Sequence, residues 1–197
     1  MLIVFVLDTS APAAPYVNQM FVGLSRFIVD INNDNMAKHA LDMAIIKFSD
    51  SFIALEDLPD IKNPNPAQPI AGGGANYTAP IKEAIRLTDE HTRSHAQVYK
   101  PWVIMLTSSP PDDDISAVAA DIIAQQNAGK FRFMALGVDG QNSDALKQLT
   151  DVVFRQKGDD FTSFFEWIGQ CIKIILRGTP TEKPQLPHLS GNVYRDK

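Results

Sequence analysis

Short apolar runs alternate with amphipathic stretches from the start of the chain. Residues 2–7 are a continuous run of β-forming residues that ends at Asp8, which is typical of a strand buried on both faces of a parallel sheet. The following stretch places its apolar residues at helical spacing, at Val17, Met20, Phe21, Leu24, Ile28 and Ile31. The opening of the chain therefore predicts a buried strand followed by a helix with one apolar face.

The same alternation continues to residue 176. It predicts strands over residues 41–48, 52–55, 102–106, 131–136 and 152–154, and helices over residues 80–91, 114–127, 144–149 and 163–176. Ser143 is expected to cap the 144–149 helix, and the spacing of Ser163 and Glu166 predicts a capping box. We expect a Rossmann-like open sheet of about six strands, mostly parallel with one antiparallel edge strand, and helices on both faces.

The chain length suits one domain, predicted over residues 1–177, with a proline-containing tail over residues 178–197. The tail carries widely spaced apolar residues at Leu186, Leu189, Val193 and Tyr194. The favoured interpretation is an extended arm that docks on a partner, because prolines lower the entropy lost on docking. The alternatives are a tail that folds back over its own sheet edge and a disordered tail.

Composition and charge argue against nucleic-acid-binding and membrane-spanning proteins. The formal net charge is −5, with acidic and basic residues mixed along the chain, so no basic stripe indicates a nucleic-acid surface. No apolar run reaches the roughly 20 residues that a membrane span needs, and no signal-peptide pattern is present. The lone Cys171 rules out an internal disulfide and is expected to be a buried thiol. We expect a cytoplasmic protein without nucleic-acid or membrane partners.

Four motifs occur in a fixed order along the predicted strands and loops. They are Leu-Asp8-Thr-Ser10, Ile-Lys-Phe-Ser49, Gly73-Gly74-Ala-Asn76 and Ile-Met-Leu-Thr107. This order resembles von Willebrand factor A domains, and most closely the TerY group of bacterial tellurite-resistance and stress operons. The resemblance covers about residues 1–176 and includes the acidic run 112–114 and the aromatic helix start at residues 164–167.

The resemblance implies a metal-ion-dependent adhesion site, but this chain matches it only in part. Asp8 and Ser10 match the first two ligand positions, whereas Pro12, Ala75 and Ser108 stand at the other three. Mg²⁺ requires near-octahedral oxygen ligands, so we expect a degenerate site, no resident cofactor and weak Mg²⁺ binding at most. The alternative is a metal-dependent adhesion domain that Thr78 repairs through a shifted loop. In a degenerate site, we expect Asp8 to accept hydrogen bonds from loop amides.

Other candidate chemistry is weaker. The three glycines at residues 72–74 fit neither phosphate-loop pattern. His91 and His95 are spaced one helical turn apart but lack a metalloprotease glutamate between them, so we interpret them as solvent-exposed. No catalytic set can be assigned, and we do not expect an enzyme. A small enzyme or nucleotide-binding protein on a doubly wound sheet is the weakest alternative.

The sequence therefore predicts a non-enzymatic protein-interaction module or scaffold. The resemblance implies a bacterial stress-response or phage-defence system, with a protein kinase or phosphatase of the same operon as partner. Tyr77 is expected to be an exposed aromatic anchor. The acidic run 112–114 is expected to favour the start of its own helix, or to contact a basic partner. The full set of expected contact residues is Asn76, Tyr77, Asp112, Asp113, Leu186, Leu189 and Tyr194.

Overall fold

The strands form one mixed sheet in a computed structural model that describes residues 1–50, 52–56, 70–95, 99–138, 144–180, 184–189 and 191–196. They are β1 (Leu2–Asp8), β2 (Asp42–Phe48), β3 (Phe52–Glu56), β4 (Trp102–Thr107), β5 (Arg132–Val138), β6 (Val153–Gln156) and β7 (Val193–Arg195). Their order across the sheet is β3-β2-β1-β4-β5-β6-β7. The five central strands are parallel, and β3 and β7 are antiparallel edge strands. The predicted fold class is confirmed, with a second antiparallel edge strand that the sequence did not predict.

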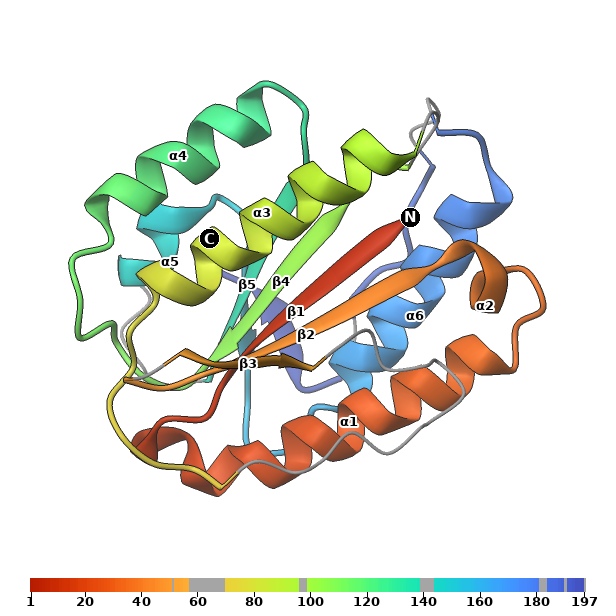
Figure 1. The fold of residues 1–197 in the computed structure, drawn as a ribbon. Coiled ribbons are helices and arrows are strands. Elements are labelled where there is room, and N and C mark those ends of the chain that lie inside the picture. Colours follow the sequence, from red (N-terminus) through yellow and green to blue (C-terminus); the bar gives the residue numbers. More distant parts are fainter. Residues whose placement is uncertain are drawn as a thin grey trace.

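Helices cover both faces of this sheet (Figure 1). They are a short 3-10 helix (Ala11–Ala13), α1 (Ala14–Asn32), α2 (Ala37–Ala40), α3 (Thr78–Ser94), α4 (Ser116–Asn127), α5 (Asp144–Leu149) and α6 (Thr162–Arg177). The core beneath α1 and α6 includes Phe5, whereas the core beneath α3 and α4 includes its neighbours Val4 and Val6. Both faces of β1 are therefore buried, which is why its sequence is apolar throughout.

The contact between α1 and α6 depends on one glycine. A Cβ atom at Gly23 would lie 2.5 Å from a ring carbon of Phe165, so only a residue without a side chain lets these helices approach so closely. The rings of Phe5, Phe27 and Phe165 pack together at this contact. Cys171 lies in the same core as predicted, and burial raises the pKa of its thiol to about 12.

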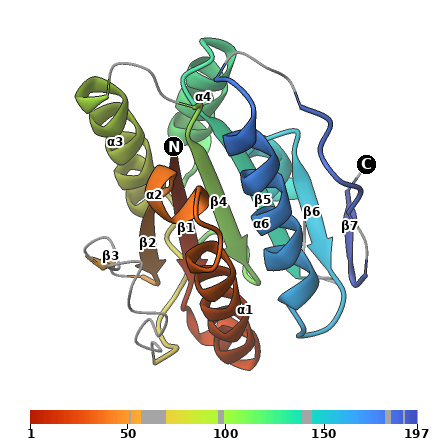
Figure 2. The ribbon, with the colours of Figure 1, turned by 90° about the vertical axis from the view of Figure 1, so that its right-hand side faces the viewer.

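The C-terminal tail packs against its own domain. Its strand β7 pairs with β6 at the sheet edge, as Figure 2 shows, and Val193 is buried there. Leu186 and Leu189 are half-buried against the core, and the indole of Trp167 donates a 2.9 Å hydrogen bond to the Pro187 carbonyl. The interpretation of the tail as a partner-docking arm anchored by the two leucines is therefore wrong, because their apolar surface is already used within the chain. Tyr194 is 39% exposed and stays a candidate contact.

Several predicted details at helix ends can be compared with the structure. The α6 helix begins at Thr162, and Asp160 accepts a 2.9 Å hydrogen bond from the Thr162 amide. The predicted capping box from Ser163 is therefore wrong, because the helix starts one residue earlier. Ser143, the expected cap of α5, lies outside the described residues. In the part of the chain that the structure describes, no helix is long and apolar enough to cross a bilayer.

Candidate functional site

The carboxyl ends of β1 and β4, with the loops that follow them, mark the topological switch point of the sheet, a position that we call the crevice. These neighbouring parallel strands have their next connections on opposite sides, and ligands of open α/β sheets bind at such a switch point. The glycine-rich loop lies directly against it. The Gly72 amide donates to the Thr9 carbonyl, and the Ala11 amide donates to the Gly73 carbonyl, each at 2.9 Å. These bonds hold the loops after β1 and before α3 together, so the crevice is the first place to look for function.

Asp8 is the charged group at the floor of the crevice. Its side chain is fully buried. The carboxylate oxygen Oδ1 accepts a 2.8 Å hydrogen bond from the Ser10 amide. The other oxygen, Oδ2, accepts hydrogen bonds from the Thr107 hydroxyl at 2.7 Å and the Ser108 amide at 3.1 Å. The prediction that Asp8 accepts loop amides is confirmed, and both of its oxygens are engaged by the fold itself.

Buried hydroxyl groups surround Asp8. The hydroxyls of Ser10 and Ser109 lie 2.9 Å apart, and both residues are buried. The buried Ser108 hydroxyl has no hydrogen-bond partner among the described residues. Serine hydroxyls need an adjacent base to become nucleophiles, and the recorded partner of Ser10 is another hydroxyl. The arrangement is therefore suited to holding the two strand ends together.

Tyr77 closes the crevice from the glycine-loop side. Its side chain is 0% exposed, and its hydroxyl lies 2.9 Å from the Thr107 hydroxyl and donates to the Ser109 carbonyl. Its ring packs edge-on against Phe48, with centroids 5.6 Å apart. Burial raises the pKa of the phenol well above its ordinary value. The prediction of an exposed anchor at Tyr77 is therefore wrong, because the ring has no surface left for a partner to cover.

The acidic run beside β4 supports the glycine loop and the start of α3. Asp112 accepts a 2.7 Å hydrogen bond from the Ala75 amide. Asp113 accepts the amides of Tyr77 and Thr78, both at 2.8 Å, so it caps α3 from a distant loop. Burial alone would raise the pKa of Asp113, but hydrogen bonds from Thr78 and Tyr77 lower it overall. Of the acidic run, only Asp114 supports the start of α4 as expected, because it accepts a 2.9 Å hydrogen bond from the Ser116 amide; for Asp112 and Asp113 this interpretation is wrong.

Two exposed carboxylates flank the glycine loop and form what we call the acidic rim, Asp50 and Asp112. A Cβ atom at Gly73 would lie 2.4 Å from Asp50 Oδ1, and one at Gly74 would lie 2.4 Å from Asp112 Oδ2. The glycines are needed because these carboxylates pack directly onto the loop backbone. Sequence reasoning missed Asp50, although its position two residues after the end of β2 places it at the same end of the strands as Asp8.

The residues at the family's metal positions can be tested for fit. Asp8 supplies a carboxylate whose oxygens already accept three donors. Pro12 lies in the 3-10 helix, and Ala75 is buried without a side-chain oxygen. Ser108 offers a hydroxyl where the family has a second carboxylate. A donor set with one carboxylate does not fit a Mg²⁺ ion that requires several oxygen ligands in an octahedron.

Comparison with known proteins supports the fold. The sequence matches no family profile and no curated protein. The von Willebrand factor domain of the type V pilus tip protein Mfa5 from Porphyromonas gingivalis superposes with a TM-score of 0.65 at 10% identity, covering 94% of this chain and 97% of that one. The chain has the von Willebrand factor A fold. At this identity the likeness concerns the fold alone.

Proximal thread matrix protein 1 from the mussel byssus is a second structural neighbour. One structure of it gives a TM-score of 0.55 at 17% identity over 99% of this chain. A further structure, described as having a zinc-occupied adhesion motif, gives 0.56 at 17% identity over 89% of this chain. The present chain spans 44–48% of the length of that protein. The shared von Willebrand factor A fold thus occurs there within a longer chain.

Proposed function

We propose that this chain is a non-enzymatic protein-interaction module that binds its partner at the acidic rim without a bridging metal ion. The observation that carries the proposal is the state of Asp8. Its carboxylate, the one expected to hold a metal in this family, is buried and accepts three hydrogen bonds from the chain itself. A carboxylate engaged in this way contributes to the stability of the fold. The surface of the von Willebrand factor A scaffold is then available to bind a partner protein without a metal ion.

The charge of the rim favours a basic partner. In the family's metal site, an acidic group of the partner completes the coordination of the ion. Here Asp50 and Asp112 are exposed beside the crevice, and the exposed Asp114 follows two residues after Asp112. An acidic partner would be repelled by these carboxylates, whereas a Lys- or Arg-bearing segment would be attracted to them. We therefore propose that the polarity of recognition is reversed relative to the metal-dependent members.

The finer biological assignment rests on the sequence motifs. We propose a scaffold of the TerY-like type in a bacterial stress-response or phage-defence system, with a kinase or phosphatase as partner. Asn76 extends the proposed contact surface, because its half-buried side chain donates a 2.9 Å hydrogen bond to the Asp50 carbonyl. The alternative, a metal-dependent adhesion domain, has one observation in its favour, which is the unpartnered hydroxyl of Ser108.

Affinity capture from the native host, followed by mass spectrometry, tests the proposal. Three forms of the full chain are compared: the wild type, the rim variant Asp50→Asn/Asp112→Asn, and the control Asp121→Asn/Asp151→Asn. The control removes the same charge from exposed positions elsewhere, and asparagine keeps an acceptor oxygen for the Ala75 amide. We expect one protein to be captured by the wild type and the control but depleted with the rim variant. Equal capture of that protein by all three forms would overturn the proposal.

A further inference from the structure

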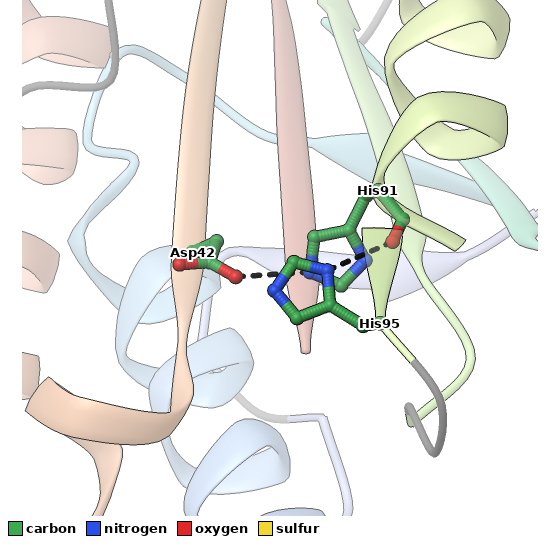
Figure 3. Close-up of side chains that lie close together, drawn as sticks. All are labelled: Asp42, His91 and His95. Carbon is green, nitrogen blue, oxygen red and sulfur yellow. Dashed lines mark hydrogen bonds and ion pairs between the residues drawn. The ribbon is translucent and has the colours of Figure 1, made fainter. Parts of the chain in front are cut away.

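A second cluster of polar side chains lies at the opposite end of the strands, where β2 begins. Asp42 is the first residue of β2, His91 lies in the last turn of α3, and His95 directly follows that helix. Because α3 runs back from the carboxyl ends of the strands, its end meets the beginning of β2. Figure 3 shows these three side chains gathered at this meeting point. The cluster is thus separate from the crevice, which lies where the strands end.

The three side chains are close enough to share one ion. His91 Nε2 lies 2.9 Å from Asp42 Oδ2. One potential ligand atom from each residue falls within 4.8 Å of the other two. The imidazole rings of His91 and His95 are stacked, with centroids 4.3 Å apart and an interplanar angle of 22°. Residues four apart on a helix lie on the same face, so the stack presents both rings to Asp42.

The hydrogen bonding of His95 is that of a metal ligand. Its Nδ1 lies 2.9 Å from the main-chain carbonyl of His91. Since a carbonyl can only accept, Nδ1 carries the proton and Nε2 is left with its lone pair. That second nitrogen is on the side of Asp42 in Figure 3. Metal-bound histidines usually donate their other N–H to a carbonyl or carboxylate in this manner, which fixes the tautomer and the ring orientation.

His91 is not the solvent-exposed residue that its sequence context indicated. It is 9% exposed, and its buried Nδ1 atom has no hydrogen-bond partner among the described residues. The pair between His91 Nε2 and Asp42 leaves this second ring nitrogen unsatisfied. Unsatisfied buried polar atoms are uncommon, and an ion that binds at the site is one recognised explanation for them.

We propose that Asp42, His91 and His95 bind a Zn²⁺ ion. Two imidazole nitrogens and one carboxylate oxygen are a frequent ligand set for zinc, whereas Mg²⁺ and Ca²⁺ prefer oxygen ligands. Zinc bonds of about 2.0–2.1 Å in a tetrahedron place ligand atoms about 3.3 Å apart. His91 and Asp42 are already near that separation, and all three ligand atoms lie within 4.8 Å of one another, so small shifts of β2 and the end of α3 would bring them to zinc distances.

The surroundings of the cluster also favour a cation. The carbonyl groups at the end of α3 carry partial negative charge, which attracts positive ions near the last turn. The Met1 amino group opposes this attraction because its positive charge disfavours a second cation near His91, but it is held by a 2.7 Å hydrogen bond to the Ala40 carbonyl. The ion would join the start of β2 to the end of α3, and water would take the fourth position. Such a site would join β2 to α3 at the end of the strands opposite the acidic rim.

Calorimetric titration of the untagged full chain with Zn²⁺ tests the proposal. The variants are His95→Gln and Asp42→Asn, and the matched control is His39→Gln, which alters an exposed histidine on α2. We expect wild type and control to bind one equivalent with equal affinity, and each ligand variant to bind at least tenfold more weakly, since even supporting residues cost about 10- to 100-fold. Unchanged affinity in both ligand variants would overturn the proposal.

A spectroscopic readout separates this site from the crevice. Co²⁺ replacing Zn²⁺ in a site of low coordination number gives strong visible absorption, which we expect in the wild type and in Asp8→Asn but not in His95→Gln. Circular dichroism of each apo variant confirms that loss of absorption is not loss of folding. Absorption that disappears in Asp8→Asn and persists in His95→Gln would place the ion in the crevice and overturn the assignment.

Discussion

The hydroxyl of Thr107 donates a 2.7 Å hydrogen bond to Asp8 Oδ2, joining the last residue of β4 to the last residue of β1. Both residues are buried, so this contact is shielded from water. Removing a donor from a buried carboxylate leaves an acceptor unsatisfied, which costs more than an ordinary hydrogen bond contributes. The contact therefore holds the ends of β1 and β4 together and contributes to the stability of the fold.

Replacing Thr107 with valine is expected to destabilise the protein. Valine keeps the shape of the side chain but removes the donor, so Asp8 Oδ2 retains only the Ser108 amide. We expect the free energy of unfolding to fall by about 1–3 kcal/mol, measured by urea denaturation. Thr92→Val is the control, because Thr92 is an exposed α3 residue whose hydroxyl donates to the Thr88 carbonyl of its own helix. Identical midpoints for wild type and Thr107→Val would contradict the role assigned to this hydroxyl.

Mg²⁺ is expected to bind the chain no more tightly than millimolar. Pro12 and Ala75 have no side-chain oxygen, and Ser108 replaces a carboxylate, so the ion would find too few ligands around Asp8. Calorimetry with Mg²⁺ and Mn²⁺ measures this directly. A micromolar affinity that disappears in Asp8→Ala would show instead that the crevice is a working adhesion site.

Asp113 is expected to stabilise α3 in a pH-dependent manner. It accepts the Tyr77 and Thr78 amides, and loss of such a cap costs about 1 kcal/mol. Because its folded pKa lies below the unfolded value of about 4, its charge stabilises the fold above that pH. This contribution is lost as the pH falls through the folded pKa. The difference in unfolding free energy between wild type and Asp113→Asn should thus shrink in acid; a difference independent of pH would contradict this account.

The tail is expected to contribute to stability through Val193. This side chain is 4% exposed in β7, where the strand covers the edge of β6. We expect Val193→Ala to cost on the order of 2 kcal/mol and to lower the Tm by several degrees. Tyr194→Ala changes the neighbouring, partly exposed residue and should have a smaller effect. If calorimetric melting of the two variants is indistinguishable, the tail does not dock in the way described.

The alternation of strands and helices could be predicted from the sequence because it depends on local periodicity. The run of residues 2–7 and the spacing along α1 each identify a buried face without knowledge of the neighbours. Asp8 was predictable for the same reason, since a carboxylate at the end of a buried strand must find donors.

The predictions that failed depend on partners far along the chain. The position of Tyr77 in a polar loop indicated exposure. Its burial depends on Phe48 and Thr107, which belong to two different strands. His91 is bonded to Asp42, a residue 49 positions away. The tail's prolines indicated an extended arm, but not that its short strand would find an open edge at β6. Such pairings follow from topology, which local patterns do not encode.

The dissociation constant of the purified complex, measured in Mg²⁺ and again in EDTA, tests the central claim most directly. The partner is the protein captured by the wild type and lost with Asp50→Asn/Asp112→Asn. We predict the same dissociation constant with and without Mg²⁺, and a weaker complex at higher salt, because exposed carboxylates attract a basic partner and salt screens that attraction. A complex that dissociates in EDTA and reforms on addition of Mg²⁺ would contradict the account.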